Sequence, residues 1–225
     1  MVFNAPLWAG KSLSWQQFSF MGQVEHRRGS FGKAARWYKK ALAQARLAQD
    51  TTGVFATLTL LGNAHLDQQK FIKAMAHYNE ALKMARSAGT RDWEGVTLNN
   101  IGDTYNNSGQ PQLAIDFFEQ AQSLMGVIDN PRRLASLLNN RGWAHEQLGQ
   151  FATAQVCYEK GLRIRRNLKD REGEGKILNS LGVLSITRGH KEEARRHLGE
   201  ALIIFRETGY RAGEQTIEQN LRRLE

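Results

Sequence analysis

Asparagine side chains recur in this sequence at intervals of 40 residues, twice as an adjacent pair and once followed by serine. The chain contains LNNIG at 98–102, LNNRG at 138–142 and LNSLG at 178–182. Asparagine is a poor helix former, because its amide competes for nearby backbone groups. Each amide also offers two donors and an acceptor oxygen. This chemistry suits the N–H and C=O groups of an extended peptide, so peptide binding is the first candidate function.

Residues for covalent or metal chemistry are sparse. The single cysteine, Cys157, stands beside Tyr158 at a packing position, and no Cys/His cluster has the spacing of a metal site. His65 and His145 align with Tyr105 at the 40-residue interval, so we expect them at helix interfaces. We find no Gly-rich phosphate loop or paired-carboxylate motif. We therefore expect a protein that is not an enzyme and needs no cofactor or metal.

The composition is that of a soluble protein. Of the 225 residues, 41% are hydrophobic and 24% are charged, and the net charge is +9, so an acidic partner must be considered. The start, MVFNAPLWAGKSLSW, lacks the regions of a signal peptide. No apolar run reaches the roughly 18 residues of a membrane helix. We expect a cytoplasmic protein without membrane insertion.

A fixed period of 40 residues organises the chain. One glycine marks each unit: Gly22, Gly62, Gly102, Gly142 and Gly182. Twelve residues later an alanine recurs, at Ala34, Ala74, Ala114, Ala154 and Ala194. Sixteen residues after the glycine stands a large side chain, at Tyr38, Tyr78, Phe118, Tyr158 and Leu198. Five units without insertions predict a repeat protein whose neighbouring units stack.

Each unit is predicted to be a helix–turn–helix. Large apolar residues precede the repeated glycine at helical spacing, as Leu178 and Leu181 do. A glycine break, such as LGQF at 148–151, then leads into a second apolar-periodic helix. The small residues are expected where the two helices cross. Asn130 and Pro131 are predicted to be the N-cap and first residue of a further helix.

The period also sets the expected organisation of the chain. We expect five units at about residues 15–54, 55–94, 95–134, 135–174 and 175–210. Residues 211–225 match the first helix of a sixth unit, but charged side chains replace the glycine and its neighbours, as in a capping helix. Residues 1–12 match no repeat.

The pattern resembles the tetratricopeptide repeat, whose signature is W-x2-L-G-x2-Y followed by A-x3-F and a small residue. Residues 98–121 match it through Leu98, Gly102, Tyr105, Ala114 and Phe118. The period exceeds the usual one of about 34, the terminal proline is missing, and the first aromatic is mostly leucine. The longer repeats of kinesin light chains and G-protein-signalling modulators are similar. The resemblance covers about residues 14–225 and implies an all-α, right-handed α-solenoid of five helix-turn-helix units plus a C-terminal capping helix.

The resemblance also implies a concave groove lined by the first helix of each unit, in which asparagines bind a peptide. Most candidate partner-binding residues lie on the arc opposite the packed face of those helices, and Asn99, Asn139 and Asn179 lie at its flank. They are Asn63, Asn99, Asn100, Asp103, Asn107, Asn139, Asn140, Trp143, Gln147, Asn179 and Ser180. Two alternatives stay open. The asparagines could instead stabilise the approach of neighbouring helices, and Trp143 could be either a binding anchor or half-buried against a helix.

Basic residues cluster instead in the second helices and turns, which form the convex side of such an array. The cluster at 163–171 contains Arg163, Arg165, Arg166, Lys169 and Arg171. A basic convex face could bind nucleic acid, but solvated charge is the commoner explanation and no nucleic-acid-reading motif accompanies it. We expect a scaffold or adaptor whose groove binds a protein or peptide. The alternative is a regulatory or nucleic-acid-associated module that uses the basic face.

Overall fold

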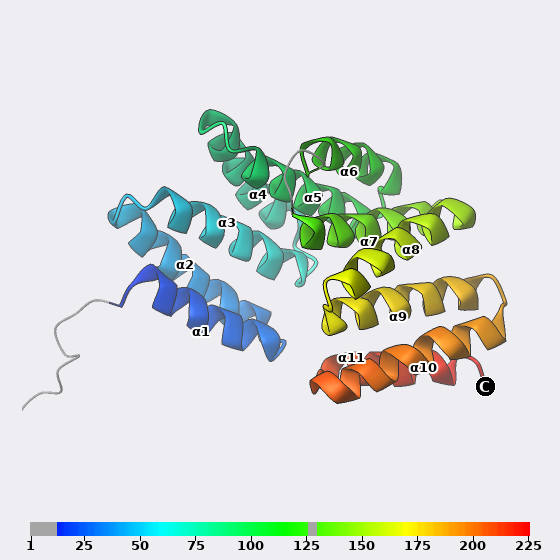
Figure 1. Cartoon of the computed structure of the whole chain (residues 1–225). Helices are drawn as coiled ribbons and strands as arrows, with labels where there is room; N and C mark the ends of the chain where they lie inside the picture. Colours follow the sequence, from blue (N-terminus) through cyan, green and yellow to red (C-terminus); the bar gives the residue numbers. More distant parts are fainter. Residues whose placement is uncertain (1–12, 126–129) are drawn as a thin grey trace, which may run out of the picture. The chain divides into compact units, whose positions relative to one another are not determined.

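The computed structural model describes residues 13–125 and 130–225 (Figure 1). Residues 1–12, which match no repeat, lie outside this range, as do residues 126–129. The described chain forms two compact units, one ending at Trp93 and the other beginning at Glu94. Within the described ranges the secondary structure is all helical and contains no strand, as predicted.

The first unit consists of consecutive antiparallel helices. They are α1 (Trp15–Arg27), α2 (Phe31–Leu47), α3 (Thr51–Leu66) and α4 (Phe71–Ser87). Helix α2 packs against both α1 and α3, and α4 packs against α3. Trp93, at the end of the unit, stacks on Phe55 of α3 with ring centroids 4.4 Å apart.

The second unit continues the same alternation. Its helices are α5 (Arg91–Asn107, which begins just before the boundary), α6 (Pro111–Met125), α7 (Pro131–Gln147), α8 (Phe151–Asn167), α9 (Arg171–Thr187), α10 (Lys191–Thr208) and α11 (Arg211–Arg222). Helices α7 to α11 each pack on the next, and α7 also contacts α9. The odd-numbered helices are the first helices of the repeats, and α11 packs on both α9 and α10.

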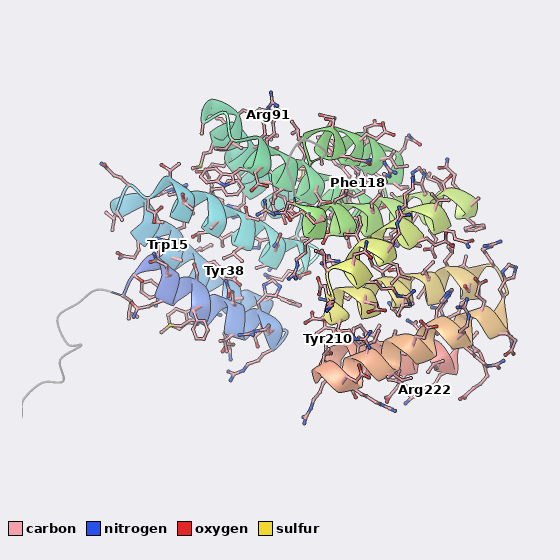
Figure 2. The ribbon with its side chains drawn as sticks, viewed as in Figure 1. Trp15, Tyr38, Arg91, Phe118, Tyr210 and Arg222 are labelled. Carbon is pink, nitrogen blue, oxygen red and sulfur yellow. The ribbon has the colours of Figure 1, made fainter. Side chains whose placement is uncertain are left out.

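The repeated glycine lets the two helices of each repeat approach closely. A Cβ atom added at Gly142 would lie 2.7 Å from Cε1 of Tyr158, and one added at Gly62 would lie 2.2 Å from Cε1 of Tyr78. Gly102 makes the same approach to Phe118. Tyr78 and Phe118 are fully buried (Phe118 is labelled in Figure 2). The sixteen-residue interval read from the sequence is therefore a contact across the helix crossing, as predicted.

Every helix from α1 to α10 whose end is described terminates in a left-handed residue, and these residues recur every 20 positions. They are Gly29, Gln49, Gln69, Gly89, Gly109, Gly149, Lys169, Gly189 and Gly209. In each case the next backbone N–H returns to a carbonyl five residues earlier, as Asp170 N does to Arg165 O. This is the Schellman arrangement, which satisfies the last carbonyls of a helix. One turn geometry thus serves both the turns within repeats and those between them.

Side-chain caps fix several helix starts. Asn130 Oδ1 accepts the backbone N–H of Arg133, and Pro131 is the first residue of α7, as the sequence predicted. Asp50 and Asp170 cap α3 and α9 in the same way, through Gly53 and Gly173. These bonds satisfy backbone donors that have no partner within the helix.

Candidate functional site

Neighbouring first helices are joined by hydrogen bonds between residues 41 positions apart, which we call rungs. In the second unit, Asn139 Oδ1 of α7 accepts from the Ser180 hydroxyl of α9 at 3.0 Å. One repeat further on, Asn179 Oδ1 of α9 accepts from Asn220 Nδ2 of α11 at 2.8 Å. Neighbouring first helices lie side by side with an axial offset of one residue relative to the 40-residue repeat. Each residue of the pair therefore faces the one 41 positions away in the sequence.

A second row of rungs lies two helical turns further along the first helices. Gln147 Nε2 of α7 donates to Asn106 Oδ1 of α5 at 2.7 Å. The Thr187 hydroxyl of α9 donates to Glu146 Oε1 of α7 at 3.5 Å. In the first unit, His26 and Asp67 form the corresponding pair at 2.6 Å. Helices α7 and α9 are therefore joined by polar side chains in both rows.

A pocket of about 260 Å³ opens between the two rungs that join α7 and α9. Its lining comes from three helices: Asn139, Asn140, Trp143 and Glu146 of α7, Tyr158 of α8, and Asn179, Ser180 and Val183 of α9. We call it the Trp143 pocket. Its volume is below the roughly 300–1,000 Å³ of small-molecule sites. It suits a single side chain better than a whole small-molecule ligand.

The carboxylate of Glu146 is the charged group of this pocket. Its Oε2 accepts a hydrogen bond from the Tyr158 hydroxyl at 2.8 Å. Burial raises the pKa of Glu146, against the opposing effect of the Tyr158 and Thr187 hydrogen bonds. Burial and the nearby carboxylate also raise the pKa of Tyr158, which stays a neutral donor. In the part of the chain that the structure describes, Glu146 has no Lys, Arg or His within ion-pair distance.

The sequence-predicted asparagines fall into groups with different partners. Asn139 and Asn179 accept the bonds that form the first row of rungs. The side chains of Asn99 and Asn100 contact each other at 3.3 Å, and Asn99 Oδ1 is buried without a partner in the described chain. Asn140 lines the Trp143 pocket, and within the described residues its amide makes no hydrogen bond.

The other predicted residues are also placed by local contacts. Asn107 Nδ2 donates to the backbone and side-chain oxygens of Asp103, four residues earlier on α5. Asn63 lies in the first unit, where its Oδ1 accepts from the Tyr78 hydroxyl at 2.6 Å. Gln147 and Ser180 belong to rungs. The structure thus brings Asn139, Asn140, Trp143, Asn179 and Ser180 together around one pocket.

Trp143 is 37% exposed and forms one wall of the pocket. The sequence distinguishes Trp143 from the other repeats, which carry Gln23, Asn63, Asp103 and Val183 at this position. Glu146 and Tyr158 were not among the predicted site residues. Glu146 could have been found in the same way, since the corresponding residues are His26, Leu66, Asn106 and Ile186. Both unusual residues of the fourth repeat line the same pocket.

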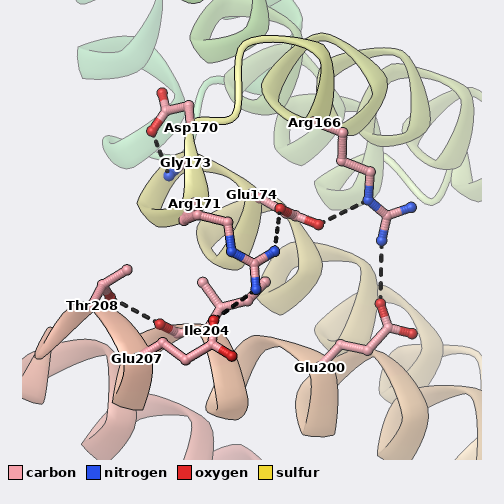
Figure 3. Close-up of polar contacts among 9 residues, drawn as sticks. All are labelled: Arg166, Asp170, Arg171, Gly173, Glu174, Glu200, Ile204, Glu207 and Thr208. Atoms are coloured by element: carbon pink, nitrogen blue, oxygen red, sulfur yellow. Dashed lines mark hydrogen bonds and ion pairs between the residues drawn. The ribbon is translucent and has the colours of Figure 1, made fainter.

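The basic cluster at 163–171 differs from the solvated convex face that the sequence predicted. The Arg165 side chain is only 11% exposed, pairs with Asp170 and donates to Ser136 of α7. Arg166 pairs with Glu174 and Glu200, and Arg171 pairs with Glu174 and Glu207 (Figure 3). These arginines tie α8, α9 and α10 together. The carboxylates on neighbouring helices, which the repeat pattern does not reveal, are the reason for the difference.

The histidines and the cysteine occupy structural positions. His65 is buried and stacks on His77, with ring centroids 5.5 Å apart. Burial and the neighbouring His77 and lysines lower the pKa of His65 to about 4. Cys157 is buried, and its Sγ accepts a hydrogen bond from the Arg141 guanidinium. Over the described ranges, no group of three His, Cys, Asp or Glu residues could hold a metal ion, and no helix is long and apolar enough to cross a membrane.

Paired helices, close glycine contacts and rungs between first helices define an α-helical repeat protein with a pocket between successive repeats. The chain belongs to the tetratricopeptide repeat family, whose family model matches residues 18–87, 53–126, 93–167 and 133–207. This agrees with the resemblance recognised in the sequence.

Two curated proteins resemble parts of the chain. Regulatory protein AfsR of Streptomyces griseus is 27% identical over 125 residues, which is 56% of this chain and 12% of that protein. Response regulator aspartate phosphatase H of Bacillus subtilis (strain 168) is 26% identical over 106 residues, 47% of this chain and 28% of that protein. The matched regions are thus small parts of both relatives.

Solved structures share the fold at low sequence identity. A Rap protein complexed with competence and sporulation factor superposes with a TM-score of 0.78 at 14% identity, covering 86% of this chain and 54% of that one. The Rap conjugation gene regulator of plasmid pLS20, in complex with the Phr* peptide, gives 0.74 at 16% identity, covering 93% and 60%. BtubC from P. vanneervenii gives 0.67 at 23% identity, covering 86% and 80%.

Proposed function

We propose that this chain is a non-enzymatic scaffold or adaptor, and that the face of α7 and α9 around the Trp143 pocket binds an extended segment of a partner protein. One observation carries the proposal. The amide of Asn140, which makes no hydrogen bond to the residues that the structure describes, lines the same pocket as the partly exposed ring of Trp143. A free amide can bind a peptide backbone, and an aromatic ring beside it can bury a partner side chain.

The rungs give this face its rigidity. Asn139 and Asn179 are engaged with the next helix, so we assign them to holding the groove in shape rather than to the ligand. Contact with the ligand then falls to Asn140 and Trp143. Asn100, Asp103 and Asn107 on α5 are the positions that extend the same face towards the preceding repeat. Under this proposal, the asparagines divide between the two roles considered for them: Asn139 and Asn179 join helices, and Asn140 contacts the ligand.

The structural relatives support a peptide as the ligand class. Two of them are Rap proteins, one complexed with competence and sporulation factor and one with the Phr* peptide. The curated relatives are a regulatory protein and a response regulator aspartate phosphatase. This chain matches only small parts of the two curated relatives, so the proposal takes no property from them. It takes only the binding of a peptide, from the Rap structures.

A nucleic-acid role for the basic face has less support. Arg165, Arg166 and Arg171 are held in ion pairs, which leaves fewer charges available for phosphates. Lys160 and Arg163 of α8 are exposed and, within the described residues, form no ion pair. They provide the variants that test the alternative.

The test is selection of binders from a display library of random 12-residue peptides, followed by titration of the selected peptide against purified variants. Asn140→Ala should weaken binding by about 2- to 13-fold, the effect of one hydrogen bond of 0.5–1.5 kcal/mol. Trp143→Ala should weaken binding by about fivefold or more, as expected for an anchor worth over 1 kcal/mol. Asn167→Ala, an exposed asparagine on α8, is the matched control.

The alternative makes a different prediction. If the selected ligand loses affinity in Lys160→Glu with Arg163→Glu and not in Asn140→Ala or Trp143→Ala, the basic face is the binding site. Binding that falls steeply with salt would accompany that result. Recovery of no peptide that binds the chain would also overturn the proposal.

A further inference from the structure

Two residues of the fourth repeat depart from the repeat pattern, and both line the Trp143 pocket. Only this repeat places tryptophan one residue after the repeated glycine and a carboxylate four residues after it. Trp143 and Glu146 are three positions apart on α7, so their side chains share one face of the helix. The packing of the repeat does not require these residue types, since other units build the same positions from different side chains.

The rung that contains Glu146 does not need its charge. Between α5 and α7, the corresponding rung joins the neutral amides of Asn106 and Gln147 at 2.7 Å. A glutamine at 146 could accept the Tyr158 hydroxyl with its carbonyl oxygen and donate from its amide to the Thr187 hydroxyl, which itself donates to Val183 O. Structural need therefore explains a hydrogen-bond acceptor at this position but not a negative charge.

The charge also lacks a counterion in the described part of the chain. Tyr158 and Thr187 supply neutral hydroxyls, and no cation lies within ion-pair distance of Glu146. Glu146 is half-buried, and this burial raises its pKa because it removes part of the water around the ionised carboxylate. A buried charge is costly until it is paired. A cation brought by a ligand would remove that cost.

The neighbouring pocket between α9 and α11 provides a contrast. It is lined by Lys176, Asn179, Phe205, Tyr210, Gly213 and Thr216 and has a volume of about 190 Å³. Its cation is already balanced, because Lys176 pairs with Glu172 and lies 5.1 Å from the centre of the Tyr210 ring. Its charge is therefore satisfied within the chain, whereas the residues that the structure describes offer no counterion to the charge of the Trp143 pocket.

We propose that the Trp143 pocket is a specificity pocket for a cationic side chain, arginine or lysine, of the bound segment. The Glu146 carboxylate pairs with the cation, and the ring of Trp143 stacks against it. An aromatic face beside a carboxylate is a favourable environment for a guanidinium, which pairs and stacks at once. This inference rests on the proposed function, since it names the side chain that the groove selects.

The experiment uses small probes and the full chain, so it does not depend on knowing the partner. N-acetyl-arginine methylamide, its lysine counterpart and the neutral N-acetyl-citrulline methylamide are titrated in the millimolar range into 15N-labelled protein. The indole N–H resonance of Trp143, identified by its loss in Trp143→Phe, reports binding. We expect arginine and lysine probes to shift it in a saturable way, and citrulline to bind about tenfold more weakly or not at all.

Glu146→Gln should abolish the preference for arginine over citrulline, while Glu159→Gln, on the exposed face of α8, should keep it. If Glu146→Gln does not fold, the comparison of arginine with citrulline on the unaltered chain still decides the question. Equal binding of the two probes, or no shift with either, overturns the inference.

The result separates this inference from the proposed function. If a selected peptide binds through Asn140 and Trp143 but the arginine probe causes no shift, the specificity assignment is wrong and the peptide site stands. If the arginine probe binds but selected peptides ignore Asn140 and Trp143, the pocket recognises cations and the proposed function is wrong.

Discussion

The side-chain oxygen of Asn139 accepts a hydrogen bond from the hydroxyl of Ser180 at 3.0 Å, although 41 residues separate them in the chain. The next residue, Asn140, makes no such bond within the described chain and lines a pocket instead. Two adjacent asparagines on one helix therefore have different roles. The first joins α7 to α9, and the second is available to a ligand.

This difference gives the first prediction. Asn139→Ala should lower the free energy of unfolding by about 0.5–1.5 kcal/mol more than Asn140→Ala, because only the first loses an intramolecular hydrogen bond. Both substitutions make the same change in helix propensity at neighbouring positions, so each serves as the control for the other. Urea denaturation followed by circular dichroism measures the difference. Equal effects would contradict the assignment of the two amides.

The second prediction concerns the helix crossing. Gly142→Ala should destabilise the chain by about 1–3 kcal/mol, because its Cβ would lie 2.7 Å from the Tyr158 ring in a fully packed core. Gly199→Ala on α10 is the control, since a Cβ there meets no atom within 4 Å. It should be stabilising by up to about 1 kcal/mol through helix propensity. A thermal melt that ranks the two variants the other way round would show that the crossing tolerates a methyl group.

The third prediction follows from the placement of Arg165. Arg165→Glu should cost about 3–5 kcal/mol, because it leaves Asp170 beside a like charge at a site where both side chains are largely buried. Arg163→Glu, two residues away on the exposed face of α8, should change stability by about 0.5 kcal/mol or less. Denaturant titration of both variants makes the comparison. If Arg165→Glu left the free energy of unfolding unchanged, Arg165 would instead be a solvated charge on the convex face, as the sequence suggested.

The fourth prediction concerns pH. The pKa of His65 is lowered to about 4, so the folded state disfavours the protonated ring that the unfolded chain accepts below about 6.5. The stability that depends on neutral His65 is therefore complete above pH 6.5 and is lost as the pH falls towards 4. The groups that face it are His77, Lys39, Lys70 and Lys73.

The variant His65→Tyr removes this titration. It places at position 65 the residue type that the next repeat has at the equivalent position, Tyr105. The loss of unfolding free energy between pH 7.5 and pH 4.5 should be smaller in the variant by about 1–3 kcal/mol. Denaturant titrations at the two pH values give the comparison. An identical pH dependence in the two proteins would rule out His65 as a source of acid sensitivity.

Much of the fold could be predicted from the sequence because the period of 40 residues encodes it directly. The contact of Gly142 with Tyr158 is a sixteen-residue interval repeated in every unit. The Asn130 cap follows from local chemistry that involves only a few neighbouring residues. Such features depend on short-range geometry, which sequence spacing specifies.

The site was only partly predictable. Asn140 and Trp143 could be placed on one arc of a helix, and bonds between helices were one of the two roles considered for the asparagines, but the sequence could not assign that role to Asn139 and Asn179 in particular. Those bonds depend on the axial shift between neighbouring helices, which places residues 41 apart side by side. The ion pairs of Arg165 and Arg166 depend in the same way on carboxylates from other helices. Spacing within one repeat contains no information on that shift.

The central claim is that a partner segment lies on α7 and α9 at the Trp143 pocket, and photo-cross-linking tests it most directly. A selected peptide carrying a benzophenone side chain is cross-linked to the full chain, and mass spectrometry locates the attached residues. Excess unlabelled peptide is the control for specific attachment. We expect the competed cross-links to fall within residues 139–147 and 179–187. Cross-links concentrated around Lys160 and Arg163 of α8 would contradict the claim and favour the basic face.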